Sequence, residues 1–378
     1  MSTPDFIRVQ PGAANYFSHL GALAQIEQFY PQASLNEVLW IGGRKALAAA
    51  EPYLPALYTD PRSLHARFTG HCTERTVAAY AETGRHADLV IGIGGGSAVD
   101  TAKAVAHRLG KPFIAIPTIA ATCAAWTPLS VWYDDEGRAL RFELFPLASQ
   151  LVLVEPRILL AAPADFLRAG IGDTLAKWYE ARVLCDAEDA LPLTAQLGLS
   201  VARQIHDSLL ADGPAALVAI ARGEMNESFV QVVDAIIAGG GLVGGLGERF
   251  TRLAAAHSIH NGLTVLPQTA KFLHGAKVAY GILVQLALEE RNDELQRLDT
   301  ALTTLGLPRK LADLGVALAN EGEVDAFIAH TLRANESIHY LPGVVDAPRL
   351  WHALRRVEEL GAPSASPTNE PSDTLEFA

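Results

Sequence analysis

The sequence predicts an α/β N-terminal domain with a parallel sheet, followed by an all-α C-terminal domain. Short apolar runs alternate with helical patterns in the first half, and helical patterns dominate after about Pro163. The length of 378 residues exceeds one ordinary core, so two domains are expected. We place the α/β domain at residues 1–162, the helical domain at 163–361, and a disordered tail, rich in Pro, Ser and Thr, at 362–378.

The first half shows strands that are each followed by a helix. This order is typical of right-handed βαβ units, whose ligands bind outside the carboxyl ends of the strands. One crevice is therefore expected to collect Gly42–Gly43, Gly94–Gly96 and Thr118. The predicted strands are 37–41, 64–69, 89–93 and 111–118, and the predicted helices are 44–50, 73–86 and 97–109.

The central motif of this half is DLVIGIGGGSAVDTAK, from Asp88 to Lys103. It predicts a strand, a turn of three glycines and a helix that begins at Ser97. Glycines allow a ligand to approach the backbone closely, and a helix N-terminus suits a phosphate group. The spacing matches neither GxGxxG nor GxxxxGK[ST], so a tight connection without a ligand is the alternative. The residues further along the chain favour a dinucleotide pyrophosphate here.

Composition excludes several classes of protein. The formal net charge of -12 and the pI of about 5.5 argue against a nucleic-acid partner. The three cysteines show neither zinc-knuckle spacing nor a disulfide framework, which predicts a reducing, cytoplasmic location. The N-terminus lacks the apolar core of a signal peptide, and no apolar run approaches ~18 residues, so no membrane partner is expected. The apolar segment 236–247 is glycine-rich and predicts a buried, closely packed helix.

The second half contains candidate metal ligands within long helical patterns. Asp173 lies in AGIGDTLAKWYEA, His257 and His260 lie in AAAHSIHNGL, and His274 precedes Gly275 in KFLHGAKVAYG. Two imidazoles and a carboxylate suit a divalent metal that keeps open coordination positions. The alternatives are that Asp173 is a helix N-cap and that the histidines are hydrogen-bonded core residues. The predicted helices are 164–185, 191–211, 227–247, 250–263, 275–290, 292–305, 322–333 and 347–360.

Five ordered motifs resemble the glycerol dehydrogenase branch of the metal-dependent, iron-containing type of alcohol dehydrogenase. They are GIGGGSAVDTAK, IPTIAATCAAWTPLSVWY, GIGDTLAKWYEA, AAAHSIHNGLT and FLHGAKVAYG, and the resemblance runs from about residue 8 to 360. A subgroup of bacterial hydroxycarboxylate dehydrogenases, which reduce 2-oxo acids, is most similar, because it shares DAIIAGGG, GGLG and SIHYLP. The resemblance implies the dehydroquinate synthase-like fold, with a dinucleotide-binding domain, a helical metal- and substrate-binding domain and an active site between them.

The resemblance also implies site residues. It places the metal ligands on Asp173, His257 and His274, and His260 is a candidate catalytic proton relay. The iron-binding branch has a further histidine where this chain has Lys177, which favours one zinc ion on three protein ligands. The implied cofactor contacts are Gly94, Gly95, Gly96, Ser97 and Ala98 at the pyrophosphate, then Thr118, Ile119 and Ala121, and Thr127, Leu129 and Tyr133 on the nicotinamide side.

Two departures from the glycerol dehydrogenase pattern bear on specificity. Cys123 stands where those enzymes have an aspartate that contacts the polyol, which argues against glycerol oxidation. NAD-preferring members have an aspartate at the end of the first strand, whereas this chain has Gly43 followed by Arg44 and Lys45. With no carboxylate to repel a 2′-phosphate, we predict NADP. The alternative is that Arg44 is a solvated residue at a helix start and that either NADP or NAD binds.

We therefore predict a metal-dependent NAD(P)H oxidoreductase that interconverts 2-oxo acids and 2-hydroxy acids. The alternative is a dehydrogenase of glycerol or other vicinal diols that uses NAD. A dehydroquinate synthase-like lyase needs several basic residues around a phosphorylated substrate, which we do not find, and a non-catalytic binding protein would not need the three ligand residues. The resemblance implies a homo-oligomer, a dimer or an octamer. No single Lys or Arg stands out as the residue that binds the substrate carboxylate.

Overall fold

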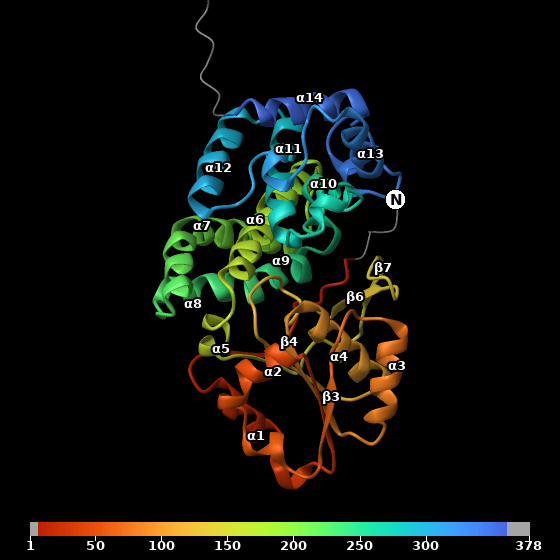
Figure 1. Ribbon diagram of the computed structural model, residues 1–378, viewed down its shortest axis with the longest axis vertical. Coiled ribbons are helices and arrows are strands. Elements are labelled where there is room, and N and C mark those ends of the chain that lie inside the picture. Colours follow the sequence, from red (N-terminus) through yellow and green to blue (C-terminus); the bar gives the residue numbers. More distant parts are fainter. Residues whose placement is uncertain (1–6, 361–378) are drawn as a thin grey trace, which may run out of the picture.

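The computed structural model describes residues 7–360, and the predicted tail at 362–378 lies outside them. The chain forms an α/β part and a helical part that stack along the long axis of the molecule (Figure 1). This arrangement confirms the predicted fold class.

Six strands of the described chain form one parallel sheet with the order β1-β8-β5-β4-β2-β3. The predicted strands are present as β2 to β5. The sequence analysis did not identify β1 and β8, which extend the sheet beyond β5. The strands are β1 (Asn15–Ser18), β2 (Val38–Gly42), β3 (Ser63–Arg67), β4 (Leu89–Gly94), β5 (Phe113–Pro117) and β8 (Leu151–Val154).

The register of the sheet brings the predicted ligand-binding turns together. Gly42 pairs with Ile93, and Gly94 pairs with Pro117, so β2, β4 and β5 end side by side. The backbone N–H of Thr118 donates to the Gly94 carbonyl over 3.1 Å. The three turns therefore line one edge of the sheet, as the strand order predicts.

Burial explains why these central strands were recognisable. Every residue of β2, β4, β5 and β8 is buried. Strands that are covered on both faces of the sheet have continuous apolar sequences, which a sequence pattern identifies. Helices follow three of the strands and complete the βαβ order. They are α2 (Arg44–Ala50), α3 (Glu74–Thr83) and α4 (Gly96–Leu109), preceded by a short α1 (Gln25–Phe29) and followed by α5 (Pro156–Leu160).

The helical part begins with α6 and agrees closely with the predicted helices. Three boundaries differ: α7 continues to Arg222, a π-helix at Ala235–Gly239 separates α8 from α9, and α10 begins at Ala255. The helices are α6 (Ala164–Asp186), α7 (Leu193–Arg222), α8 (Glu227–Asp234), α9 (Gly240–Gly247), α10 (Ala255–Leu263), α11 (His274–Leu288), α12 (Asn292–Leu305), α13 (Glu321–Thr331) and α14 (Ala347–Glu358).

The segment Glu227–Phe250 is, by length and composition alone, the one described stretch that could cross a membrane. Buried core helices share these properties, and 56% of its most apolar window is buried within the molecule. A Cβ on Gly241 would stand 2.2 Å from the Trp126 side chain, and one on Gly245 would stand 2.5 Å from the Gln10 carbonyl oxygen. The close packing predicted for residues 236–247 is therefore present.

Helices α6, α10 and α11 approach one another through glycines. A Cβ on Gly275 would stand 1.8 Å from the Ala169 carbonyl oxygen, and one on Gly172 would stand 2.5 Å from the Gly275 carbonyl oxygen. Between α11 and α10, a Cβ on Gly281 would stand 2.3 Å from the Ala256 carbonyl oxygen. Only residues without a side chain allow these backbones to lie so close.

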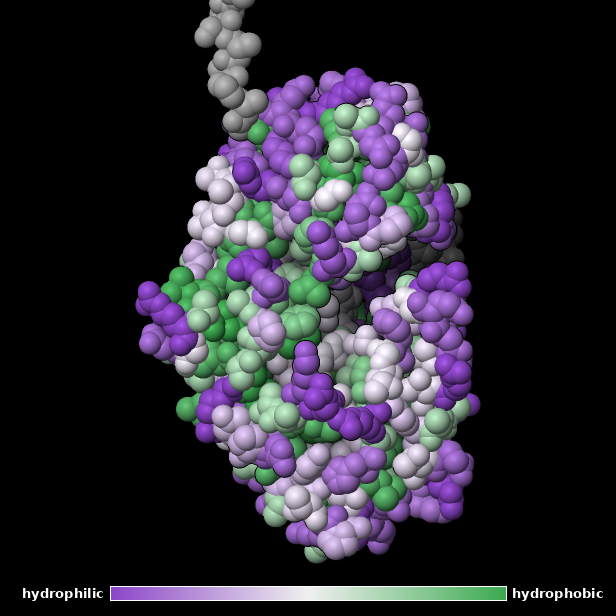
Figure 2. Space-filling view, in the orientation of Figure 1, coloured by the Kyte–Doolittle hydropathy of each residue, from purple (hydrophilic) through white to green (hydrophobic). Residues whose placement is uncertain are grey.

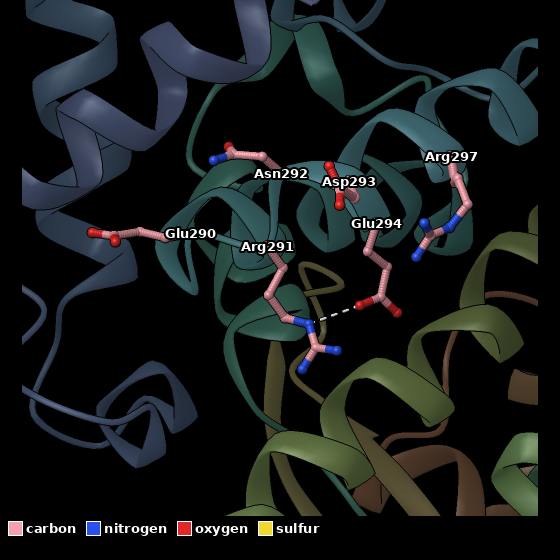
Figure 3. A pocket seen from close by; sticks show the side chains of 6 residues that line it. All are labelled: Glu290, Arg291, Asn292, Asp293, Glu294 and Arg297. Atoms are coloured by element: carbon pink, nitrogen blue, oxygen red, sulfur yellow. Dashed lines mark hydrogen bonds and ion pairs between the residues drawn. The ribbon is translucent and has the colours of Figure 1, made fainter.

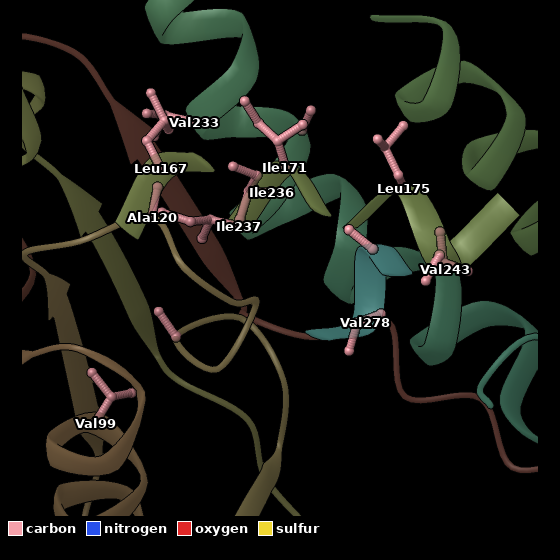
Figure 4. Packing of buried hydrophobic residues seen from close by; sticks show 14 of the residues in the cluster. Val99, Ala120, Leu167, Ile171, Leu175, Val233, Ile236, Ile237, Val243 and Val278 are labelled. Carbon is pink, nitrogen blue, oxygen red and sulfur yellow. The ribbon is translucent and has the colours of Figure 1, made fainter. Parts of the chain in front are cut away.

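The two parts share a continuous apolar contact. Ala120, in the loop after β5, lies among Leu167, Ile171 and Ile236 of the helical part (Figure 4). The Ala120 carbonyl oxygen would be only 2.1 Å from a Cβ on Gly170, so α6 rests directly on this loop. The loop after β5 is thus held between the sheet and the helices.

We expect Gly281→Ala to lower the free energy of unfolding by about 1–3 kcal/mol, because the added methyl group overpacks the contact between α11 and α10. Chemical denaturation measures this change. Gly322→Ala is the control, since a Cβ there meets nothing closer than 4.0 Å and an alanine in α13 adds up to about 1 kcal/mol of stability. Equal stability of the two variants would contradict the packing argument.

Candidate active site

Asp173, His257 and His274 come together from three helices. Asp173 lies in the middle of α6, so the interpretation of this residue as an N-cap is wrong, while His257 lies in α10 and His274 begins α11. The Asp173 Oδ1 atom is 3.0 Å from His274 Nε2 and 3.4 Å from His257 Nε2. One ligand atom from each residue lies within 4.8 Å of the others, which suits a divalent ion on an N,N,O set.

Glu180 orients His257 from behind. Its Oε2 lies 2.7 Å from His257 Nδ1, and its Oε1 accepts hydrogen bonds from the backbone N–H groups of Ala254 and His257. The Glu180 side chain is fully buried. A carboxylate on Nδ1 keeps the proton on that nitrogen and leaves Nε2 free to bind a metal.

The charges around Asp173 prepare the site for a cation. Burial raises the pKa of the Asp173 carboxyl, but His274 and His257 more than offset this and hold it well below its usual range. Burial lowers the pKa of His257, but the Glu180 and Asp173 carboxylates raise it to about 9. A proton therefore occupies this position at neutral pH, and a metal ion must displace it to bind.

His260 extends the site away from Asp173. Its Nε2 is 3.0 Å from His274 Nδ1, and its Nδ1 is 3.1 Å from Asn261 Oδ1. The amide of Asn261 donates to Glu336. Burial, with His274 nearby, holds the pKa of His260 well below its usual range, so this imidazole is neutral. The predicted proton relay thus has hydrogen-bonding partners on both sides.

The glycine turn lies where the sequence places it. Gly94 ends β4, Gly95 is the N-cap of α4, and the helix begins at Gly96, one residue earlier than predicted. A Cβ on Gly95 would meet the Ile119 side chain at 2.6 Å, so the turn and the next loop touch. The backbone N–H groups of Ala98 and Val99 donate to the Gly95 carbonyl oxygen. The N–H groups of Gly96 and Ser97 are therefore the ones at this helix start that suit the predicted phosphate contact.

A buried ion pair ties this helix to the loop that carries the predicted nicotinamide contacts. Lys103 Nζ donates to the carbonyl oxygens of Ala124 and Leu129 and lies 3.2 Å from Asp100 Oδ1. Asp100 also accepts from the backbone of Val131. This loop leads into the antiparallel hairpin of β6 (Leu129–Tyr133) and β7 (Ala139–Leu144), which the sequence analysis did not identify. Its residues Thr127, Leu129 and Tyr133, with Ile119 and Ala121 before it, are all partly exposed.

Arg44 is exposed at the first turn of α2 and borders a hollow of about 340 Å³. Arg67, at the end of β3, also lines this hollow, and it pairs with Gly42 across the strands. Arg44 and Arg67 therefore both line this hollow, while Glu51 adds one carboxylate further along α2.

Another hollow of about 420 Å³ lies at the turn between α11 and α12, lined by charged side chains (Figure 3). Its charges pair with one another and with Arg182: Glu294 accepts from both Arg291 and Arg182. It contains none of the candidate ligands. The surface is also hollowed between the α/β part and the helical part (Figure 2).

Sequence reasoning missed Glu180 and the pair of Asp100 and Lys103. Glu180 follows Asp173 by seven residues, which is two turns on the same helix face, so the spacing contained a usable signal. Lys103 donates to two backbone carbonyl oxygens of the loop after β5, and no rule of sequence spacing indicates such a contact.

The comparisons with known proteins identify the class. Residues 13–156 match the family described as iron-containing alcohol dehydrogenase. A curated relative is 55% identical over 94% of this chain and 99% of its own length. The chain belongs to this family, and it is a dehydrogenase that acts on alcohol groups.

The relative with 55% identity is hydroxycarboxylate dehydrogenase A of Escherichia coli K12. Glycerol dehydrogenase of Pseudomonas putida is 38% identical over 78% of this chain and 81% of its own length. Among solved structures, glycerol dehydrogenase of Schizosaccharomyces pombe superposes with a TM-score of 0.83 at 27% identity, covering 93% of this chain and 91% of its own. Both the hydroxycarboxylate and the glycerol branches are thus represented.

We expect Glu180→Gln to weaken zinc binding by about 10–100-fold. The amide still accepts the backbone hydrogen bonds, but its NH₂ group faces His257 Nδ1 and moves the proton to Nε2, which then cannot ligate. Titration against a competing chelator measures the affinity. Glu336→Gln replaces another buried carboxylate, which accepts from Asn261, and leaves His257 untouched, so it is the control. Full zinc affinity in Glu180→Gln would refute the assigned orientation.

Proposed function

We propose that this protein reduces 2-oxo acids to 2-hydroxy acids, reversibly, with a nicotinamide cofactor and one divalent metal ion. The observation that carries the proposal is the 55% identity, over nearly the whole length of both chains, with a hydroxycarboxylate dehydrogenase. The N,N,O set of Asp173, His257 and His274 supports it, because this chemistry needs a Lewis acid for the substrate oxygen. The loop after β5 meets both the glycine turn, at Gly95, and α6, at Gly170.

The residues divide the work as follows. Asp173, His257 and His274 would hold the metal, and Gly94, Gly95, Gly96, Ser97 and Ala98 would hold the pyrophosphate of the cofactor. A bound divalent ion supplies polarisation of the substrate oxygen, and a bound reduced nicotinamide supplies the hydride. The chain itself must deliver the proton that the new hydroxyl group needs. His274 is 42% exposed and touches His260, so this pair is the proposed route for that proton.

Cys123 argues against the alternative, a glycerol or vicinal-diol dehydrogenase that uses NAD. Burial raises the pKa of the Cys123 thiol, so the group is neutral and a poor acceptor for substrate hydroxyls. The glycerol dehydrogenases among the relatives keep this alternative open to test.

We propose NADP as the cofactor and zinc as the metal. Arg44, which follows Gly43, and Arg67 line the same hollow and would offer two cations to a 2′-phosphate. Zinc fits three protein ligands of this kind, since Lys177 stands in place of a fourth. A homo-oligomer of two or eight copies and a cytoplasmic location stay predictions from the family resemblance and the cysteine content.

We expect the protein to oxidise NADPH with 2-oxobutyrate or 2-oxoglutarate, to lose this activity after chelation and to regain it with zinc. Absorbance at the nicotinamide band follows the reaction, with dihydroxyacetone as the competing substrate. Turnover of dihydroxyacetone with NADH alone would instead identify a glycerol dehydrogenase. Chelator-resistant activity would remove the metal from the proposal.

We expect Arg44→Ala to raise the KM for NADPH by about 10–100-fold, the loss of one hydrogen bond to a charged group, and to leave the KM for NADH unchanged. Steady-state kinetics with both cofactors measure the difference. Arg75→Ala removes an exposed arginine elsewhere in the α/β part and serves as the control. Equal effects on the two cofactors would show that Arg44 does not read the 2′-phosphate.

A further inference from the structure

Helix α6 carries a second charged residue on the face that bears Asp173. Lys177 follows Asp173 by four residues, so it lies about 6 Å further along the helix axis on the same face. Its side chain is partly buried, yet it makes no hydrogen bond or ion pair with any residue between 7 and 360. Partly buried cations normally have a partner, so this ammonium group is available to a ligand.

Lys177 keeps its charge because of its neighbours. Burial lowers its pKa, while the Asp173 and Glu180 carboxylates act against burial and favour the charged ammonium group. Cys123 itself stays a neutral thiol, since burial raises its pKa. The ammonium group therefore has no anion on the side of the loop after β5.

Arg252 adds a second cation from another part of the helical domain. It lies between η6 (Glu248–Phe250) and α10, and its Cγ would be 3.7 Å from a Cβ on Gly244 of α9. Its positive charge lowers the pKa of Lys177, so the two cations act on each other. Within the described chain Arg252 also has no hydrogen-bonding or ion-pairing partner. An anionic ligand between two such cations would relieve their repulsion.

We infer that Lys177 and Arg252 bind the carboxylate of the substrate and thereby select 2-oxo acids over neutral carbonyl compounds, an inference that rests on the proposed function. The carboxylate of a 2-oxo acid adjoins the reacting carbonyl. A substrate whose carbonyl oxygen lies at Asp173 must therefore place its carboxylate a few ångströms away, within reach of a lysine one helical turn along.

Cys123 belongs to the same specificity site. A Cβ on Gly240 would stand 3.6 Å from Cys123 Cβ, so the thiol lies between the loop after β5 and α9. An aspartate at this position would pair with Lys177 and take the charge that the substrate carboxylate needs. The neutral thiol leaves Lys177 unpaired. Cysteine in place of aspartate at position 123 would thus weaken the binding of a diol and leave the Lys177 ammonium group available to the carboxylate of an acid.

The test compares 2-oxobutyrate with its uncharged analogue methyl 2-oxobutyrate. For Lys177→Gln we expect kcat/KM to fall at least tenfold for the acid and to stay within about twofold for the ester, as the loss of a charged hydrogen bond predicts. Lys177→Arg should recover part of the loss. Calorimetric titration with oxamate, an unreactive analogue, should show the same fall in affinity. Lys271→Gln, an exposed lysine just before α11, is the control and should keep the wild-type preference.

Two further variants test the site without replacing Lys177. Arg252→Gln and Cys123→Asp should each lower the preference for the acid over the ester at least tenfold, with the metal content unchanged. They decide the inference if Lys177→Gln does not fold or loses its metal. A wild-type preference for the acid that survives in these variants would overturn the carboxylate site alone. A wild-type protein that reduces no 2-oxo acid would overturn the proposed function itself.

Discussion

The candidate site depends on how closely three helices approach one another. α6, α10 and α11 meet at glycines, where a methyl group would stand 1.8 to 2.5 Å from a backbone carbonyl oxygen of the neighbouring helix. A residue with a side chain could not fit at these distances, so the glycines allow the three helices to bring Asp173, His257 and His274 together. The same principle joins the two parts of the molecule, since Gly170 rests on the Ala120 carbonyl oxygen. Packing of small residues therefore determines the chemistry that the site can perform.

The charged residues near this packing fall into two groups, or layers: buried carboxylates with the histidines, and cations. Buried carboxylates stand at the centre: Asp173 faces the histidines, and Glu180 holds His257 from the far side. Lys177 and Arg252 add two partly buried cations that have no hydrogen-bonding or ion-pairing partner among residues 7–360. A metal ion would complete the first layer, and the proposed acidic substrate would complete the second. The proposed preference for a chelating anion would then depend on charge balance and not on shape alone.

The loop after β5 connects these layers to the cofactor. It begins beside Gly94, carries Ala120 and Cys123 against the helical part, and is held by Lys103 before it enters the β6–β7 hairpin. Because burial of both Lys103 and Asp100 makes each dependent on the other, the loop cannot shift without breaking a buried pair. The buried pair therefore restrains this loop, which suits its proposed role beside the nicotinamide.

The sequence by itself determined the fold class, the central strands and the candidate ligands, because these depend on local signals. Continuous apolar runs predict buried parallel strands, and glycines after a strand predict the turn. The short motifs around Asp173, His257 and His274, which resemble those of a known family, mark the candidate ligands. The edge strand β1, the hairpin and strand β8 depend on partners that are far apart in the sequence, and their own patterns are too short to identify. Only the tertiary structure placed Glu180 behind His257, Lys103 under the loop and Arg252 near Lys177. The first two are contacts between residues 77 and 21 positions apart, whereas Arg252 acts on Lys177 through its charge. Packing rather than sequence spacing decides all three.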